Sequence, residues 1–114
     1  MKRETKSLRN GVFLLLSMML LNSCVDNAEK TVPKVYTVEI KQMQFQPAEL
    51  TVAKGDTVVF INHDIVTHDV TEEPNKAWTS APLANGSSWS MEVTKSVDYF
   101  CSIHPVMKGK LLVQ

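Results

Sequence analysis

Three side chains that can bind a metal ion stand close together near the end of the chain, in the stretch YFCSIHPVMKGKLLVQ (residues 99–114). Cys101, His104 and Met107 follow one another at intervals of three residues. Each alone has a structural alternative, because a lone cysteine is usually a small buried residue and a methionine often fills gaps in a core. Together, a thiol, an imidazole and a thioether form a ligand set that a soft metal ion can use.

A further histidine is available upstream, where INHDIVTHDV (residues 61–70) contains His63 and His68. One cysteine, two histidines and a methionine are the ligands of blue copper sites, in which a weak, long axial Met bond accompanies a trigonal His₂Cys group. The residue types therefore predict a site for one copper ion. Residue types alone do not decide whether His63 or His68 is the second imidazole ligand.

The segments around these residues have the pattern of short β-strands. Alternating sequences rich in β-branched residues occur at 35–40, 49–62, 68–73, 88–94, 97–101 and 109–114. Lys54-Gly55-Asp56 is a turn signal that divides the second segment into two strands, and residues 73–87 have no convincing period and predict a loop. Seven to eight short strands with turns between them predict an all-β domain, a two-sheet Greek-key β-sandwich.

The last two predicted strands should carry the cysteine to the edge of the core. Val97, Tyr99 and Cys101 alternate along one strand and therefore point to the same side. We expect Cys101 to end this strand, with the histidine and methionine on the loop that follows. Met43 and Met91 are expected to fill the core rather than to bind metal.

The closing stretch resembles that of the cupredoxins, the blue copper proteins, and within them the amicyanin and plastocyanin-like group. Cys101-x-x-His104-x-x-Met107, followed by a final apolar strand, is similar to the short ligand loop of amicyanins. AELTVAKGDTVVF (residues 48–60) is also similar to the family. The resemblance covers residues 35–114 and implies the cupredoxin fold.

The resemblance also chooses between the two upstream histidines. The family places an asparagine six residues before its first ligand histidine, and Asn62 has this spacing to His68 but not to His63. The copper ligands that the resemblance implies are His68, Cys101, His104 and Met107.

The position after His68 departs from the family pattern. The family usually has an asparagine there, which ties the two ligand loops together, whereas this chain has Asp69. Its backbone N–H can still donate to the sulfur of Cys101, but an ionised carboxylate cannot donate. Because hydrogen bonds and charges around the ligands tune a metal, we expect this change to affect the reduction potential.

The resemblance implies a protein that carries single electrons between redox partner proteins by cycling Cu(II) and Cu(I), without transforming a substrate and therefore not an enzyme. His104 should be the ligand whose edge reaches the surface. The residues expected to surround it as an apolar docking patch are Pro105, Val106, Pro82 and Leu83. Plain loop packing is the alternative for this patch. We expect a monomer.

Other classes of function fit less well. The alternative kept open is a periplasmic copper-handling protein without a dedicated electron-transfer role. A dinuclear copper site would need two cysteines in the loop, a structural zinc site would not use methionine, and no other feature resembles a cysteine hydrolase. From Cys24 onward the chain has eight basic and 11 acidic side chains, which does not favour nucleic acid as a partner.

The beginning of the chain predicts export. Residues 1–23 carry four basic side chains and one acidic one, and residues 12–21 are an apolar run of ten, too short to span a bilayer but suited to a signal peptide. LNSC (residues 21–24) resembles a bacterial lipoprotein box, so Cys24 is expected to carry lipid. Residues 24–34 then form a linker, and the domain would be held at a membrane surface that faces the periplasm or the exterior, in either case extracytoplasmic.

Cys24 has two alternative explanations. An ordinary signal peptide cut nearby would leave it as a free thiol. A disulfide with Cys101 would pair the only two cysteines of the chain, but it would join a flexible tether to the end of a buried strand. Lipid on Cys24 leaves Cys101 as a lone thiol in an exported protein, which again suggests that Cys101 binds metal.

Overall fold

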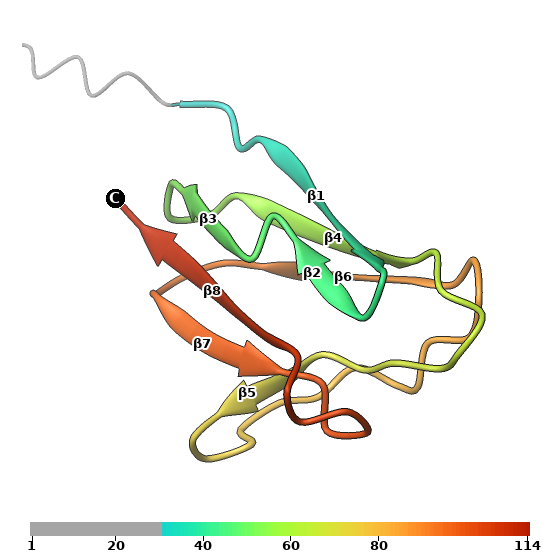
Figure 1. Cartoon of the computed structure of the whole chain (residues 1–114). Coiled ribbons are helices and arrows are strands. Elements are labelled where there is room, and N and C mark those ends of the chain that lie inside the picture. Colours follow the sequence, from blue (N-terminus) through green and yellow to red (C-terminus); the bar gives the residue numbers. More distant parts are fainter. Residues whose placement is uncertain (1–30) are drawn as a thin grey trace, which may run out of the picture.

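The structure, a computed structural model, describes residues 31–114, and this part of the chain forms eight β-strands and no helix. The strands are β1 (Val35–Lys41), β2 (Gln44–Gln46), β3 (Glu49–Val52), β4 (Thr57–Asn62), β5 (Thr71–Glu73), β6 (Ser88–Glu92), β7 (Val97–Phe100) and β8 (Lys108–Val113). They form two four-stranded sheets, ordered β2-β1-β4-β6 and β3-β8-β7-β5, which face each other (Figure 1). The predicted all-β, two-sheet Greek-key sandwich is confirmed.

Within the described residues, no helix is long and apolar enough to cross a membrane.

The core between the sheets follows from the alternation of side chains along the strands. In β4, Val58 and Phe60 are fully buried, whereas their neighbours in the strand are only half-buried. Tyr99 of β7 is fully buried as well, and its ring packs edge-on against Phe45 and Phe60, with ring centroids 4.8 Å and 5.3 Å apart. Perpendicular aromatic rings at these distances contribute packing energy beyond the area they bury.

Strand β2 is the element that the sequence pattern did not predict. It pairs with β1 through a tight turn in which Gln42 and Met43 have positive φ angles of 53° and 58°. Such turns are usually signalled by asparagine or glycine, and neither is present here. Met43 is 40% exposed in this turn, so the expectation that it fills the core is wrong, whereas Met91 packs against the core.

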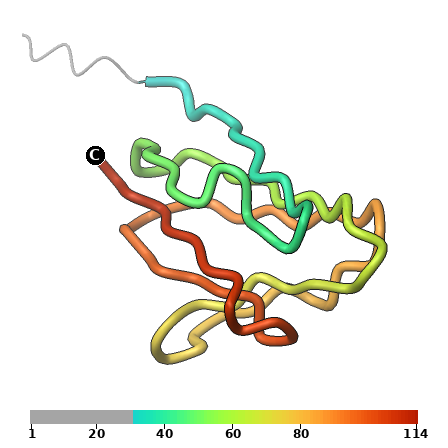
Figure 2. Tube along the Cα trace, viewed as in Figure 1, coloured from blue at the N-terminus to red at the C-terminus, as the bar shows by residue number. Residues whose placement is uncertain are grey.

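The loops at one end of the sandwich carry the candidate metal ligands. One loop follows β4 and reaches His68, which pairs with Leu83 in an isolated bridge rather than within β5. The other connects β7 to β8, whose antiparallel register places Phe100 opposite Lys108. Residues 101–107 therefore form a closed hairpin loop, which can be followed in Figure 2 as the orange-red turn that leads into β8.

Candidate metal centre

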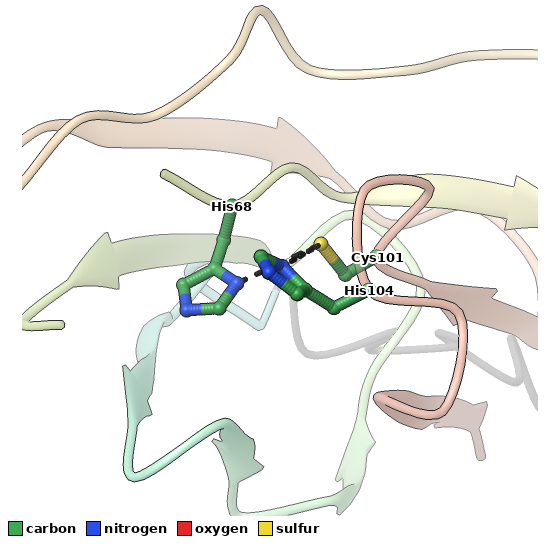
Figure 3. A group of neighbouring side chains, drawn as sticks. All are labelled: His68, Cys101 and His104. Carbon is green, nitrogen blue, oxygen red and sulfur yellow. Dashed lines mark hydrogen bonds between the residues drawn. The ribbon is translucent and has the colours of Figure 1, made fainter. Parts of the chain in front are cut away.

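Three potential ligands meet at this end of the sandwich. The nitrogen and sulfur atoms that His68, Cys101 and His104 can offer to a metal all lie within 4.8 Å of one another. The Cys101 Sγ atom is 3.7 Å from His68 Nδ1 and 3.9 Å from His104 Nδ1. Figure 3 shows the three side chains converging, with His68 on one loop and the other two on the loop that follows β7.

The spacing of these atoms fits a metal ion. Bonds of about 2.1 Å to nitrogen and 2.3 Å to sulfur, as in zinc sites, place the two ligand atoms about 3.8 Å apart when they are 120° apart around the ion. The two sulfur–nitrogen distances of 3.7 Å and 3.9 Å agree with this value. One soft thiolate with two imidazoles in this arrangement is the donor set of a trigonal copper site.

Cys101 lies in a fully buried environment directly after β7. Its Sγ atom accepts a hydrogen bond from the backbone N–H of Asp69 at 3.4 Å. Its own N–H donates to the carbonyl of Met107 at 3.0 Å, and the N–H of Met107 donates to the carbonyl of His104 at 3.0 Å. These backbone bonds close the ligand loop tightly, and they bring Met107, which is only 3% exposed, back beside the cysteine.

Asn62 shapes the loop that carries His68. It is fully buried at the end of β4, where its Nδ2 donates to the carbonyls of Val66 and Leu83 at 2.9 Å and 2.8 Å. Its Oδ1 accepts the backbone N–H of Asp64 at 2.9 Å. Every hydrogen-bonding group of this amide is thereby used, which fixes the path of the loop into the site.

Asp69 ties the two ligand loops together in a way that the sequence did not suggest. Its Oδ1 accepts the backbone N–H of Ser102 at 2.7 Å and the hydroxyl of Thr71 at 3.1 Å, and its Oδ2 accepts the hydroxyl of Ser102. An ionised Asp69 cannot donate a hydrogen bond, but Ser102 on the other ligand loop supplies the donors instead. As a result, a carboxylate contacts Ser102, the residue that follows Cys101.

Asp64 is a part of the site that the sequence reasoning missed. Its Oδ2 lies 2.8 Å from Nε2 of His68, on the opposite side of the imidazole ring from Cys101. Burial is the largest single influence on the pKa of this aspartate and raises it. Hydrogen bonds from the Met43 N–H, the His68 ring and the Gln42 N–H, together with the electrostatic attraction of His68, outweigh burial, so the pKa of Asp64 is lower than its ordinary value.

The remaining candidate residues lie apart from this cluster. His63 is largely exposed, and its Nε2 is 3.6 Å from a carboxylate oxygen of Glu39. It is absent from the group of neighbouring ligands that the described residues form. Cys24 and the predicted signal peptide lie outside the described residues.

The sequence profile of the copper-binding proteins of the plastocyanin/azurin family matches residues 33–114, which is nearly the whole described domain. The chain is a cupredoxin. Copper is therefore the cofactor of this protein, in agreement with the donor set of the cluster.

Individual relatives of this cupredoxin point to the amicyanins. The chain is 32% identical over 83 residues to the amicyanin of Paracoccus denitrificans and 28% identical over 83 residues to that of Paracoccus versutus. Each match covers 68% of this chain, and the chain spans only 63% of the length of either relative.

Solved amicyanin structures resemble the fold as well. The copper(I) form of one amicyanin mutant superimposes with a TM-score of 0.66 at 29% identity, over 70% of this chain and 82% of that one. A second copper(I) mutant gives a TM-score of 0.67 at 28% identity, over 75% and 87% of the two chains. Fold and sequence thus agree on a cupredoxin of the amicyanin type.

Proposed function

We propose that this cupredoxin is a type 1, or blue, copper electron-transfer protein whose ligands are His68, Cys101, His104 and Met107. The observation that supports this most strongly is the buried Cys101 sulfur between the Nδ1 atoms of two histidines. The amicyanin relatives support the same function. The role is that of a carrier rather than an enzyme.

Copper bound to these residues would supply a one-electron Cu(II)/Cu(I) couple. The protein contributes rigidity, because Cys101 follows a core strand and both ligand loops are fixed by the hydrogen bonds of Asn62 and Asp69. Ligands that do not move between oxidation states keep the cost of each electron transfer small. Burial of the sulfur excludes water from the site.

The electron would enter and leave through His104, which is the partly exposed member of the cluster. Exposed apolar side chains lie on both ligand loops, with Ile65 94% and Val106 88% exposed. Leu83 is buried and does not belong to such a surface, contrary to expectation. We propose that redox partner proteins dock at this end of the sandwich.

A redox titration tests the proposed function. Purified protein loaded with one equivalent of Cu(II) should show an intense visible charge-transfer band that a mild reductant bleaches and an oxidant restores, with one electron exchanged per copper. A colourless Cu(II) complex would contradict the proposal. Release of copper upon reduction would instead favour a copper-handling protein.

The carboxylate of Asp69 should lower the reduction potential, because a negative charge beside the thiolate stabilises Cu(II) over Cu(I). We expect Asp69→Asn to raise the potential with little loss of stability, since an amide can still accept the Ser102 N–H and donate to the Ser102 hydroxyl. Asp69→Ala should cost about 1–3 kcal/mol of unfolding free energy, because it leaves these donors without a partner. Voltammetry and urea denaturation of both variants would measure these effects. Equal destabilisation by the two substitutions would show that the amide cannot replace the carboxylate.

We further propose that the mature protein is a lipoprotein, anchored through Cys24 to a membrane surface outside the cytoplasm. The position of this cysteine directly after the apolar run supports the proposal. Diacyl attachment would provide the two chains that stable anchoring requires. Cells fed labelled fatty acid should label the native protein but not Cys24→Ser, and the variant should appear in the soluble fraction. Equal labelling of both proteins would refute lipidation at this residue.

A further inference from the structure

We propose that Asp64 is a positioning residue for the copper site, which acts through His68 to orient the imidazole and to lower the reduction potential. This inference rests on the proposed function, because it takes His68 as a copper ligand. The carboxylate belongs to the same loop as His68, four residues before it, and touches the ring edge that faces away from Cys101.

The hydrogen bond to Asp64 determines the tautomer of His68. The ring is fully buried, so water does not compete for either nitrogen. Asp64 Oδ2 is 2.8 Å from Nε2, and an ionised carboxylate can only accept a hydrogen bond. Nε2 therefore carries the proton, and the lone pair of the neutral ring lies on Nδ1, the atom 3.7 Å from the Cys101 sulfur. Asp64 thus leaves the Nδ1 lone pair of His68 free to bind the metal ion.

Asp64 is itself held in place by two backbone hydrogen bonds. Its Oδ1 accepts the backbone N–H of Gln42 at 2.8 Å, and its Oδ2 accepts that of Met43 at 3.0 Å. Both donors belong to the β1–β2 turn, whose positive φ angles direct two successive N–H groups towards the carboxylate. The Asp64 side chain is only 16% exposed. The turn therefore holds the negatively charged carboxylate of Asp64 against the ligand histidine and away from solvent.

The contact between Asp64 and His68 should affect the bound copper ion. A carboxylate that accepts the second N–H of a ligand histidine fixes the ring and increases its basicity. Both the greater basicity and the nearby negative charge favour Cu(II) over Cu(I), since the oxidised ion carries more positive charge. Asp64 should therefore lower the reduction potential, and its removal should raise it.

Asp56 offers a matched control. It is a buried aspartate that, like Asp64, accepts two backbone N–H groups, in this case from Lys34 and Ala53, each at 2.8 Å. It precedes β4, whereas Asp64 follows that strand, so the two carboxylates lie at opposite ends of the sandwich. Asp56→Asn should perturb a turn in the same way as Asp64→Asn without any contact to a ligand histidine.

The experiment compares the copper-loaded native protein with Asp64→Asn and Asp56→Asn by voltammetry and by denaturation. We expect both variants to lose stability, and only Asp64→Asn to raise the potential. Loss of an outer hydrogen bond to a metal ligand typically changes metal affinity by about 10–100-fold. A tenfold decrease in the affinity for Cu(II) relative to Cu(I) corresponds to an upward shift of the reduction potential of about 59 mV for a one-electron couple.

Two results would overturn the role of Asp64 and leave the proposed function standing. One is a blue Asp64→Asn protein with the native reduction potential, and the other is an equal shift of the potential in Asp64→Asn and Asp56→Asn. NMR of the unaltered Cu(I) protein provides a second measurement should Asp64→Asn fail to fold. It should find the His68 proton on Nε2 and protected from exchange, and a ring without that proton would also overturn the inference. If the native protein itself forms no blue complex, the proposed function fails, and the role of Asp64 fails with it.

Discussion

Replacing Cys101 with alanine is expected to abolish the visible charge-transfer band of the Cu(II) protein while the sandwich remains folded. The band requires a thiolate bound to copper, and Cys101 is the one cysteine among the described residues. Alanine fills most of the space of the cysteine in a fully buried position. Visible spectroscopy of the copper-loaded variant and its far-ultraviolet circular dichroism would measure the two expectations separately.

His63→Ala is the matched control for this prediction. His63 is adjacent in sequence to the end of β4, but its side chain contacts Glu39 rather than the cluster of ligands. The variant should retain the colour of the native protein. A Cys101→Ala protein that stays blue, or a His63→Ala protein that loses its colour, would contradict the assignment of ligands.

Gly109→Ala is expected to destabilise the domain strongly. Gly109 of β8 lies opposite Tyr99 of β7, and a Cβ atom at this position would come within 2.2 Å of the tyrosine ring. The ring cannot move aside easily, because it is buried and packed edge-on against Phe45 and Phe60. Overpacking of this kind costs about 1–3 kcal/mol or more, and we expect the upper end of that range in urea denaturation.

A double-mutant cycle identifies the cause of this loss. Tyr99→Leu should be destabilising alone, but it should remove most of the additional cost of Gly109→Ala by vacating the space that the new methyl group needs. Tyr99→Phe should be well tolerated, because the buried tyrosine hydroxyl has no hydrogen-bond partner among the described residues. Strictly additive effects of Gly109→Ala and Tyr99→Leu would show that steric contact with this ring is not the reason.

Much of the fold was predictable because strands with one buried face leave an alternating pattern in the sequence. β1, β4 and β6 carry this pattern and were predicted within a few residues. β2 was not predicted, because it has three residues and its turn uses Gln42 and Met43 instead of the residues that usually adopt positive φ. Its turn is held by Asp64, whose carboxylate accepts both turn N–H groups from a distant part of the chain.

The candidate site was predictable to a similar degree. Cys101 and His104 are close in sequence, and their residue types indicate a metal. The choice of His68 over His63 depended on a family resemblance, because both lie in the same polar stretch and residue types alone do not distinguish them. Asp64 gave no signal, since its role arises from contacts with Gln42, Met43 and His68 that only the folded loops create.

We expect one copper ion to be held by His68, Cys101, His104 and Met107. A crystal structure of the copper-loaded protein, with anomalous diffraction recorded at the copper absorption edge, would locate the ion and its ligands. We expect a single copper peak between the Nδ1 atoms of the two histidines and the cysteine sulfur, with the methionine sulfur as the next nearest ligand. A copper peak elsewhere, for example beside His63, or a copper ion without the cysteine sulfur among its ligands, would contradict it.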